Sequence, residues 1–340
     1  MKRTCLFFIG PEKVELREEE LIAPGPGQVQ VQSLCSAISA GTELLLYSGE
    51  APSELPADSS LPALSGSLAY PLKYGYSMVG KVIALGKAVE KQWLGRRVFA
   101  FNPHESAFNA NIGDVQILPE GCPEKDAAFL ANMETAVNLM LDGSPRLGER
   151  VVVLGQGIVG LLSAALLARH PLDALLTFDR YPMRRDFSLK LGAQVSFDPL
   201  DSAVVEKALE LLVSRHADLV YELSGRPEAL DLALALVGEH GRIVVGSWYG
   251  KRRAPIDLGG HFHRGRVKII SSQVSQIEPA LSGRWDRQRR FDFAWKMLSE
   301  LRPGRLVTHQ FGLAQASKAY AQLAEKPTET LVVLLTYGQA

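Results

Sequence analysis

Residues 151–168, which carry no charged side chain, constrain the fold of this chain more than any other segment. The segment begins with the apolar run VVVL, passes through three closely spaced glycines and ends in a second apolar run. A stretch of about 18 apolar residues is the minimum for a membrane-spanning helix. The β-branched start and the glycines instead predict a buried strand that turns sharply into a buried helix.

The three glycines have the G-x-G-x-x-G spacing of a dinucleotide-binding turn. In such a turn the first glycine permits a tight bend, the second lets the backbone approach a pyrophosphate, and the third lets the helix pack closely on the strand. The phosphates then lie at the positive end of the helix. The alternative is that the glycines only fit a crowded strand-to-helix turn. The residues of this turn that we expect to contact a cofactor are Gly155, Gln156, Gly157, Ile158, Val159 and Gly160.

An acidic residue, Asp179, ends the next predicted strand, ALLTFD, about 20 residues after the last glycine. A carboxylate at this place accepts hydrogen bonds from the ribose hydroxyls of NAD and repels the 2′-phosphate of NADP. We therefore predict NAD as the cofactor, with Arg180 beside it. NADP stays open, because Arg180, Arg184 and Arg185 could together hold a 2′-phosphate. The other role open to these arginines is to stack on adenine or to lie in solvent.

The chain divides into two parts by its sequence pattern. Up to about residue 120, proline and glycine separate short β-rich pieces: QVQVQSL, SMVGKVIAL, RRVFAF and DVQIL. From about residue 150, apolar strands alternate with helical patterns, which indicates a parallel sheet covered on both faces. Two helical segments, 291–301 and 314–323, and a last strand, TLVVLLTY, follow. The pattern predicts an α/β fold, with a doubly wound parallel sheet and a second, mostly-β domain.

Composition narrows the class of protein. Lysine and arginine total 37, as do aspartate and glutamate, whereas nucleic-acid binding normally needs a basic excess. The three cysteines, Cys5, Cys35 and Cys122, are too widely spaced for a disulfide framework or a four-cysteine zinc site. Together with an N-terminus that lacks a signal-peptide pattern, this predicts a cytoplasmic protein without nucleic-acid or membrane partners. We expect its partner to be a small-molecule substrate.

The order of the two parts, with a return to β structure at the C-terminus, resembles the medium-chain dehydrogenase/reductase superfamily over essentially the whole chain. The resemblance implies a mostly-β GroES-like catalytic domain, 1–123 completed by 275–340, and a Rossmann NAD-binding domain, 124–274. It also implies a homodimer whose nucleotide-binding sheets pair edge to edge through their last strand, here Val267–Val274. The alternative is that residues 275–290 of the same chain cover this edge.

Two segments correspond to those that hold the catalytic zinc in zinc alcohol dehydrogenases of this superfamily. The family's G-I-C-G-T-D is replaced by A-I-S-A-G-T-E, with Ser39 or Ala40 at the cysteine position. The family's G-H-E-x-x-G is replaced by G-Y-S-M-V-G, with Tyr76 and Ser77 at the histidine and glutamate positions. Hydroxyl groups are poor zinc ligands, so we expect no metal. The segments ISAGTE, YGYSMVG, NPH and ANMETA are most similar to a zinc-free branch that includes bacteriochlorophyllide hydroxyethyl-group dehydrogenases.

Without zinc, hydrogen-bonding side chains must stabilise the reacting oxygen. Tyr76 is the first candidate, against the alternative that its ring only packs. Thr42 could pass a proton between the substrate and the cofactor ribose. Glu43 could orient a neighbour, accept the proton or form an internal ion pair. His104 could exchange a proton near neutral pH or anchor its loop. Glu134 could act in the reaction or stabilise the positive end of its helix.

Two further segments end predicted strands, where ligands bind in open α/β sheets. The resemblance implies that they border the nicotinamide and its ribose; they comprise Ser224, Gly246, Ser247 and Trp248. Trp248 could also wall a substrate pocket or pack at the edge of the core.

These features predict a zinc-independent NAD(H)-dependent oxidoreductase that interconverts a secondary alcohol and a ketone on an organic metabolite. The alternatives are a reductase of an activated C=C bond and a non-catalytic nucleotide-binding redox sensor. The destination of the hydride of NADH, a carbonyl, an alkene carbon or nothing, discriminates these three.

Overall fold

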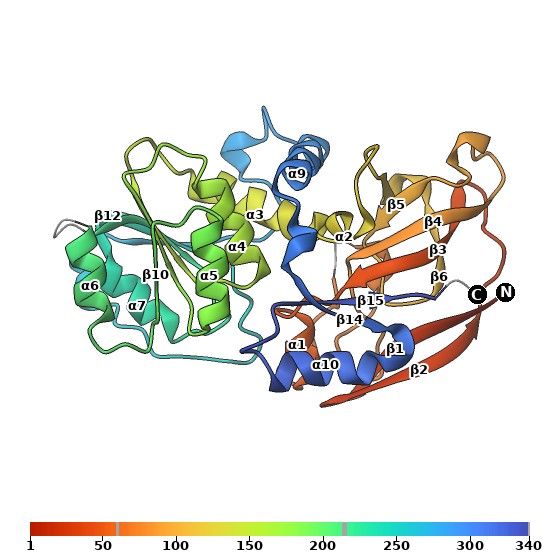
Figure 1. Ribbon diagram of the computed structural model, residues 1–340, viewed down its shortest axis with the longest axis horizontal. Helices are drawn as coiled ribbons and strands as arrows, with labels where there is room; N and C mark the ends of the chain where they lie inside the picture. Colours follow the sequence, from red (N-terminus) through yellow and green to blue (C-terminus); the bar gives the residue numbers. More distant parts are fainter. Residues whose placement is uncertain (59–60, 213–215, 339–340) are drawn as a thin grey trace. The chain divides into compact units, whose positions relative to one another are not determined.

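The computed structural model describes residues 1–58, 61–212 and 216–338, and the chain forms two compact units (Figure 1). Unit 1 comprises Met1–Ala131 and Trp295–Ala340, and unit 2 comprises Asn132–Ala294. The chain passes between the units within two helices, α3 (Leu130–Gly143) and α9 (Arg287–Leu301). The sequence places the corresponding boundaries in the flanking segments, after residues 123 and 274, because a continuous helical pattern gives no sign of a division inside it.

Unit 2 contains a six-stranded sheet in which all paired strands are parallel. Its strands, in spatial order, are β10 (Val195–Phe197), β9 (Ala174–Phe178), β8 (Arg150–Leu154), β11 (Ala217–Glu222), β12 (Val237–Val245) and β13 (Lys268–Ser271). The strand order reverses between β8 and β11. Because the loops on either side of such a switch point diverge, it is the place where open α/β sheets bind ligands.

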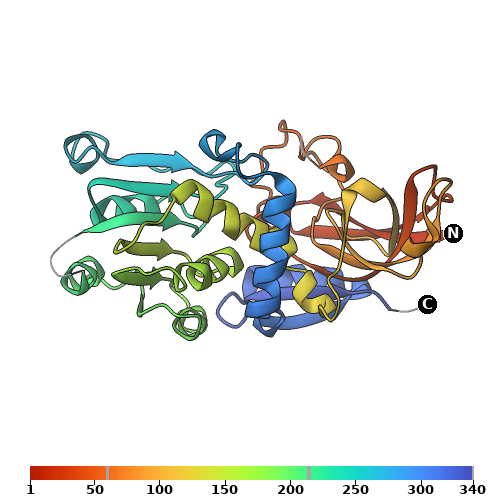
Figure 2. The same ribbon diagram turned by 90° about the horizontal axis from the view of Figure 1, so that it is seen from above.

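Helices cover both faces of this sheet, as Figure 2 shows. Val151 and Val153 of β8 pack in one core with side chains of α3 and of α4 (Ile158–Leu167). Val152 and Leu154, which point to the opposite face, pack with side chains of α6 (Val204–Leu211) and α7 (Ala229–Leu236). The helix α5 (Pro182–Lys190) lies beside α4 (Figure 1). The doubly wound sheet predicted from the sequence is confirmed.

Residues 151–168 form the strand β8, a turn and the helix α4, as the glycines predict. The helix has ten residues, too few to cross a bilayer, which needs about 20. Within the described part of the chain, every helix is too short or too polar to span a membrane.

Unit 1 is built mainly from strands. A hairpin, β1 (Lys2–Gly10) and β2 (Lys13–Glu20), accompanies a sheet of antiparallel and parallel pairs. The strands of that sheet are β3 (Gln28–Ala37), β4 (Met78–Leu85), β5 (Arg97–Ala100), β6 (Ala107–Asn111), β7 (Val115–Ile117), β14 (Val307–Gly312) and β15 (Val332–Thr336). The C-terminal strand β15 pairs with β3, so it adds to this sheet.

The short helix α1 (Glu43–Tyr47), which follows β3, and the helix α10 (Ala316–Glu325) pack on the core of unit 1. That core includes Phe8, Leu46, Met78 and Tyr320, all almost without exposed surface. A third helix, α2 (Glu124–Ala127), precedes α3. The mostly-β architecture predicted for this part of the chain is confirmed.

Candidate active site

The glycine turn between β8 and α4 is fixed by steric contacts at two of its three glycines. Gly155 has φ +89°, and a Cβ there would lie 2.5 Å from the Cα of Ser224. A Cβ on Gly160 would lie 1.9 Å from the carbonyl oxygen of Gly155. A Cβ on Gly157, in contrast, would have no atom within 4 Å. Packing within the protein therefore requires Gly155 and Gly160, whereas Gly157 leaves open space above the turn.

This open space adjoins the start of α4. Gly157 is the N-cap of the helix and has no side chain to cap it. Ile158 and Val159 supply backbone N–H groups in the first turn, where a helix has no internal acceptors for them. Such a start attracts anions, and the phosphates of a dinucleotide fit it.

Asp179 follows β9 and is held beside the turn by two backbone N–H groups. Its Oδ2 accepts a hydrogen bond from Gln156 N at 2.8 Å, and its Oδ1 accepts one from Tyr181 N at 2.8 Å. The residue is 6% exposed. Because each carboxylate oxygen has a second lone pair, the fixed carboxylate is able to accept further hydrogen bonds from ribose hydroxyls.

The three arginines near Asp179 have different surroundings. Arg180 and Arg184 both place their guanidinium groups over the ring of Tyr181, at 4.9 Å and 4.7 Å from its centroid. Arg185 instead binds the carbonyl oxygen of Asp179 at 2.7 Å and the carboxylate of Asp198 at 3.2 Å. Arg185 is therefore engaged within unit 2, and a 2′-phosphate would have to rely on the other two.

Glu222, a buried carboxylate that is not among the predicted site residues, binds groups that follow the strands β11 and β12. Its Oε1 accepts hydrogen bonds from the N–H (2.8 Å) and the hydroxyl of Ser224, and its Oε2 accepts one from the Tyr249 hydroxyl at 2.6 Å. Burial, and then the charge of Glu222, raise the pKa of Tyr249. The signal in the sequence was an acidic residue at the end of an otherwise apolar strand, ADLVYE.

The other predicted residues at these strand ends are close-packed or exposed. Ser247 Oγ accepts a hydrogen bond from Gly225 N at 2.9 Å. A Cβ on Gly246 would lie 2.7 Å from a methyl group of Leu223 and 2.8 Å from one of Leu139, so a larger residue there would have to displace these side chains. The side chain of Trp248 is partly exposed. All of them follow β11 or β12, the strands beside the switch point.

In unit 1, three hydroxyl groups from two segments of the chain meet. The Tyr76 hydroxyl shares a hydrogen bond with Ser39 Oγ and donates a longer one to Thr42 Oγ1 at 3.3 Å. We call Ser39, Thr42 and Tyr76 the hydroxyl cluster. Ser39 is buried, whereas Thr42 and Tyr76 are half-buried. Burial raises the pKa of Tyr76, and the hydrogen bonds of the two other hydroxyls lower it.

Behind the hydroxyl cluster lies a fully buried polar network. Glu43 Oε1 accepts the N–H of Ser39 at 2.8 Å, while its Oε2 contacts His104 Nε2 at 3.0 Å and accepts the Tyr320 hydroxyl. The other ring nitrogen of His104 contacts Ser36 Oγ at 2.7 Å. Glu43 and His104 have no exposed surface. The structure thus pairs Glu43 with His104. Because neither side chain is exposed, each could act on a substrate only through its neighbours.

Gly75 explains how His104 fits next to Tyr76. The glycine has φ +122°, and a Cβ there would lie 2.7 Å from the His104 ring. Any other residue would clash with the imidazole that bonds to Glu43.

Glu134 forms a buried ion pair with Arg290. It lies inside α3, where the guanidinium of Arg290 donates to its Oε1 from Nε at 3.1 Å and from Nη2 at 2.7 Å. Arg290 also donates to Asn138 Oδ1 at 2.6 Å, and both charged residues are almost completely buried. Burial raises the pKa of Glu134, and Arg290 lowers it. A carboxylate held in this way joins α3 to α9 within unit 2. A part for Glu134 in the reaction stays a prediction.

The residues at the expected zinc positions do not form a metal site. Ser39 and Tyr76 bond to each other, and hydroxyl groups are weak donors for zinc. Among the residues that the structure describes, the one group with metal-ligand spacing is Cys5, Glu19 and Glu105, elsewhere in unit 1. Arg3 and Lys73 bind both of those carboxylates at 2.8–3.5 Å, so two cations already balance them.

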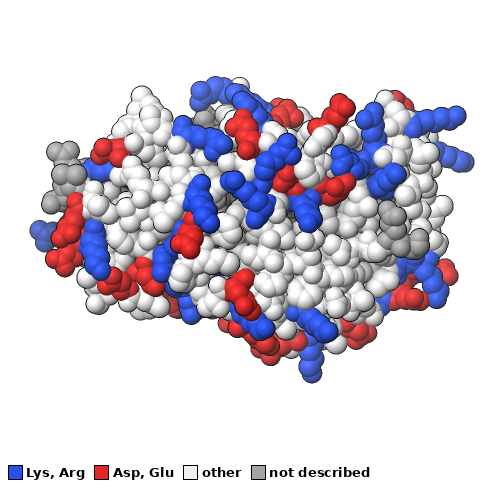
Figure 3. Space-filling model, viewed as in Figure 1, with Lys and Arg blue, Asp and Glu red and all other residues white. Residues whose placement is uncertain are grey.

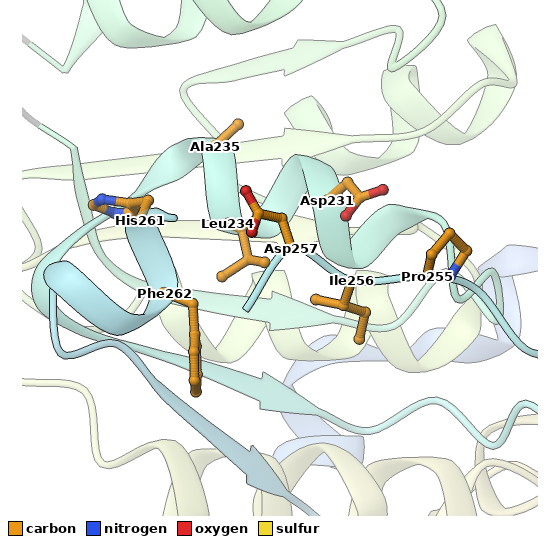
Figure 4. A pocket seen from close by; sticks show the side chains of 8 residues that line it. All are labelled: Asp231, Leu234, Ala235, Pro255, Ile256, Asp257, His261 and Phe262. Atoms are coloured by element: carbon orange, nitrogen blue, oxygen red, sulfur yellow. The ribbon is translucent and has the colours of Figure 1, made fainter. Parts of the chain in front are cut away.

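A surface hollow of about 640 Å³ lies elsewhere on unit 2. It is formed by α7, by residues 255–257 and by the short helix α8 (His261–Arg264), as Figure 4 shows. None of the candidate residues lines it. On the face of the protein in Figure 3, acidic and basic side chains are interspersed.

Comparisons with known proteins agree on the family. Residues 159–286 match the family model of the zinc-binding dehydrogenases; this stretch lies in unit 2, whereas Ser39 and Tyr76 lie in unit 1. D-guloside 3-dehydrogenase of Escherichia coli K12 is 24% identical over 77% of each chain. L-threonine 3-dehydrogenase of Pyrococcus horikoshii is 23% identical over 70% of this chain and 73% of that one.

Solved structures agree on the fold. A structure described as a short chain alcohol dehydrogenase from Escherichia coli CFT073, complexed with the cofactor NADH, has a TM-score of 0.80 and 19% identity. It covers 98% of this chain and 99% of its own. The sheet order, the glycine turn and the sequence matches together support a place for this chain in the medium-chain dehydrogenase/reductase superfamily.

Proposed function

We propose that this protein is a zinc-independent, NAD(H)-dependent oxidoreductase that interconverts a secondary alcohol and a ketone on an organic metabolite. The observation that carries the proposal is the hydroxyl cluster, in which Tyr76 bonds to Ser39 and Thr42. By their sequence motifs, Ser39 and Tyr76 match the zinc-ligand positions of the zinc alcohol dehydrogenases. Relatives named as 3-dehydrogenases support alcohol–ketone chemistry rather than reduction of a C=C bond.

The cofactor fits the turn of unit 2. The start of α4 and the space above Gly157 would hold the pyrophosphate, and Asp179 would accept the ribose hydroxyls. We propose NAD rather than NADP because the carboxylate of Asp179 repels a 2′-phosphate. When bound, the nicotinamide would supply or accept the hydride.

The residues of unit 1 would handle the proton. In ketone reduction, Tyr76 would donate its hydroxyl proton to the oxygen that becomes the alcohol, which is the role of a Lewis acid in zinc enzymes. Thr42, the half-buried neighbour, would return a proton to Tyr76. Glu43 would act by position, because it holds the backbone of Ser39. Glu43 and His104 together fix the start of α1 against the core.

Isotope transfer tests this function. A panel of ketones, enones and alcohols is screened with NADH and NADPH, and stereospecifically deuterated NADH is then used with the compounds that react. We expect deuterium at a carbonyl carbon of the product. Deuterium at an alkene carbon would instead assign the protein to C=C reduction, and an absence of transfer over a broad panel would favour a nucleotide-binding sensor.

We also propose a cytoplasmic homodimer that pairs through β13. This strand is the edge of the sheet of unit 2, and Ile269 on it is 38% exposed. An uncovered β-branched edge favours pairing with a second copy. Light scattering at micromolar concentration distinguishes a dimer from a monomer.

A further inference from the structure

The two hydroxyl neighbours of Tyr76 are not equivalent. Thr42 Oγ1 lies 3.3 Å from the phenol oxygen, beyond the usual range of about 2.5–3.0 Å for a bond between hydroxyl groups. Ser39 Oγ is the closer neighbour and is buried, at 9% exposure. The bond to Ser39 therefore sets the position of the phenol, whereas the bond to Thr42 is loose.

Both backbone groups of Ser39, its N–H and its carbonyl, form hydrogen bonds with Glu43. Its N–H donates to Glu43 Oε1 at 2.8 Å, and its carbonyl oxygen accepts the N–H of Glu43 at 2.8 Å. Glu43 is in turn fixed by His104 and Tyr320. The buried carboxylate thus fixes the serine backbone, and the serine hydroxyl fixes the phenol. Such support keeps a reacting group in place between turnovers.

We propose that Ser39 is the positioning residue of the site, with a hydroxyl that turns to donate to the Tyr76 oxygen when the phenol has lost its proton. This inference rests on the proposed function. In ketone reduction, the O–H bond of Tyr76 breaks as a new O–H bond forms on the substrate oxygen, whose carbon has received the hydride of NADH. Tyr76 is left as a phenolate, and the Ser39 hydroxyl donates to it until a proton returns from solvent through Thr42.

The groups around Tyr76 disfavour its phenolate form, so a hydrogen-bond donor to that form is needed. Burial is the main effect that raises the pKa of its phenol, and the charges of Glu43 and Asp58 raise it further. The Tyr74 ring, edge-on at 6.1 Å between centroids, adds apolar surface. Hydrogen bonds from Ser39 and Thr42 act in the opposite direction. Removal of the Ser39 hydroxyl should therefore raise the pKa of Tyr76, because a donor to the charged form is lost.

The test is a ¹⁹F NMR titration of protein that carries 3-fluorotyrosine, with Tyr76→Phe to assign the signal. We expect Ser39→Ala to raise the midpoint of Tyr76 by about one pH unit, a roughly tenfold loss of acidity. Ser39→Thr, which keeps the hydroxyl, should restore the original midpoint. Ser33→Ala is the matched control, since Ser33 is also a buried serine of this segment but bonds to the Glu105 carbonyl oxygen.

The proposal is overturned if Ser39→Ala moves the midpoint no further than Ser33→Ala. If Ser39→Ala does not fold, Ser39→Cys in the presence of chelator replaces it, because a thiol of similar shape is a weaker donor; the midpoint must then rise as well. The titration needs no substrate or cofactor. A rise without deuterium transfer would therefore refute the proposed function and leave only the hydrogen bond from Ser39 to the phenolate, whereas transfer without a rise would refute only the role of Ser39.

Discussion

The glycine turn of unit 2 and the hydroxyl cluster of unit 1 are built in opposite ways. The turn comes from one continuous segment, 155–160, and its shape depends on backbone contacts that admit only glycine at two positions. The cluster joins side chains from separate segments, and it depends on a buried network that reaches Tyr320 near the other end of the chain. Backbone geometry leaves a strong pattern in a sequence, whereas a network of side chains leaves a weak one.

The largest effect should come from Glu134, whose ion pair with Arg290 is buried. Glu134→Ala breaks a buried ion pair and leaves Arg290 without its carboxylate. We expect the free energy of unfolding to fall by about 3–5 kcal/mol, measured by denaturant titration. If the variant were as stable as the unmodified protein but had lost turnover, the result would instead support a part for Glu134 in the reaction.

Tyr76→Phe should affect the rate and spare the fold. The substitution keeps the ring packing and removes the donor to the reacting oxygen, so kcat should fall by about 10²–10³-fold. NADH affinity, measured by calorimetry, should stay the same because the turn lies in unit 2. His104→Gln is the comparison: if it abolishes the pH dependence of the rate while Tyr76→Phe does not change the rate, the proton donor is not Tyr76.

Two glycines of the same turn should respond differently. Gly160→Ala places a methyl group against the Gly155 carbonyl oxygen, and such overpacking should lower stability by about 1–3 kcal/mol. Gly157→Ala has free space in the protein, so its melting temperature should be unchanged while NADH affinity falls. If both variants lost stability equally, the space above Gly157 would not be free in the folded protein, and a ligand would have no room there.

The sequence predicts the alternating strands and helices of unit 2 and the strand-to-helix turn, because periodicity and glycine spacing report local geometry. The C-terminal completion of the β unit follows from the family resemblance. It does not predict that Arg290 binds Glu134, since these residues are far apart in the chain. Arg290 is also one of several neighbouring arginines, and nothing in the sequence distinguishes it from the others. The contact between Ser39 and Tyr76 was likewise hidden. Two substituted positions suggest a lost metal, but only the fold shows that they bond to each other.

The smallest of these effects concerns the choice of cofactor. Asp179→Ser removes the charge that repels a 2′-phosphate, while Arg180 and Arg184 remain. We expect the preference for NADH over NADPH to narrow by about tenfold, as measured by competing calorimetric titrations. Tighter binding of NADPH by the unmodified protein would contradict the role given to Asp179.

The most direct test of the account is the metal requirement of turnover. Zinc content is measured by elemental analysis, and NADH-dependent reduction of a carbonyl substrate from the screen is followed before and after chelation. Because hydroxyl groups occupy the two expected ligand positions, we expect well under one zinc per chain and an unchanged rate in chelator. Stoichiometric zinc, with loss of activity on chelation and recovery when zinc is restored, would contradict the claim that the hydroxyl cluster replaces the metal.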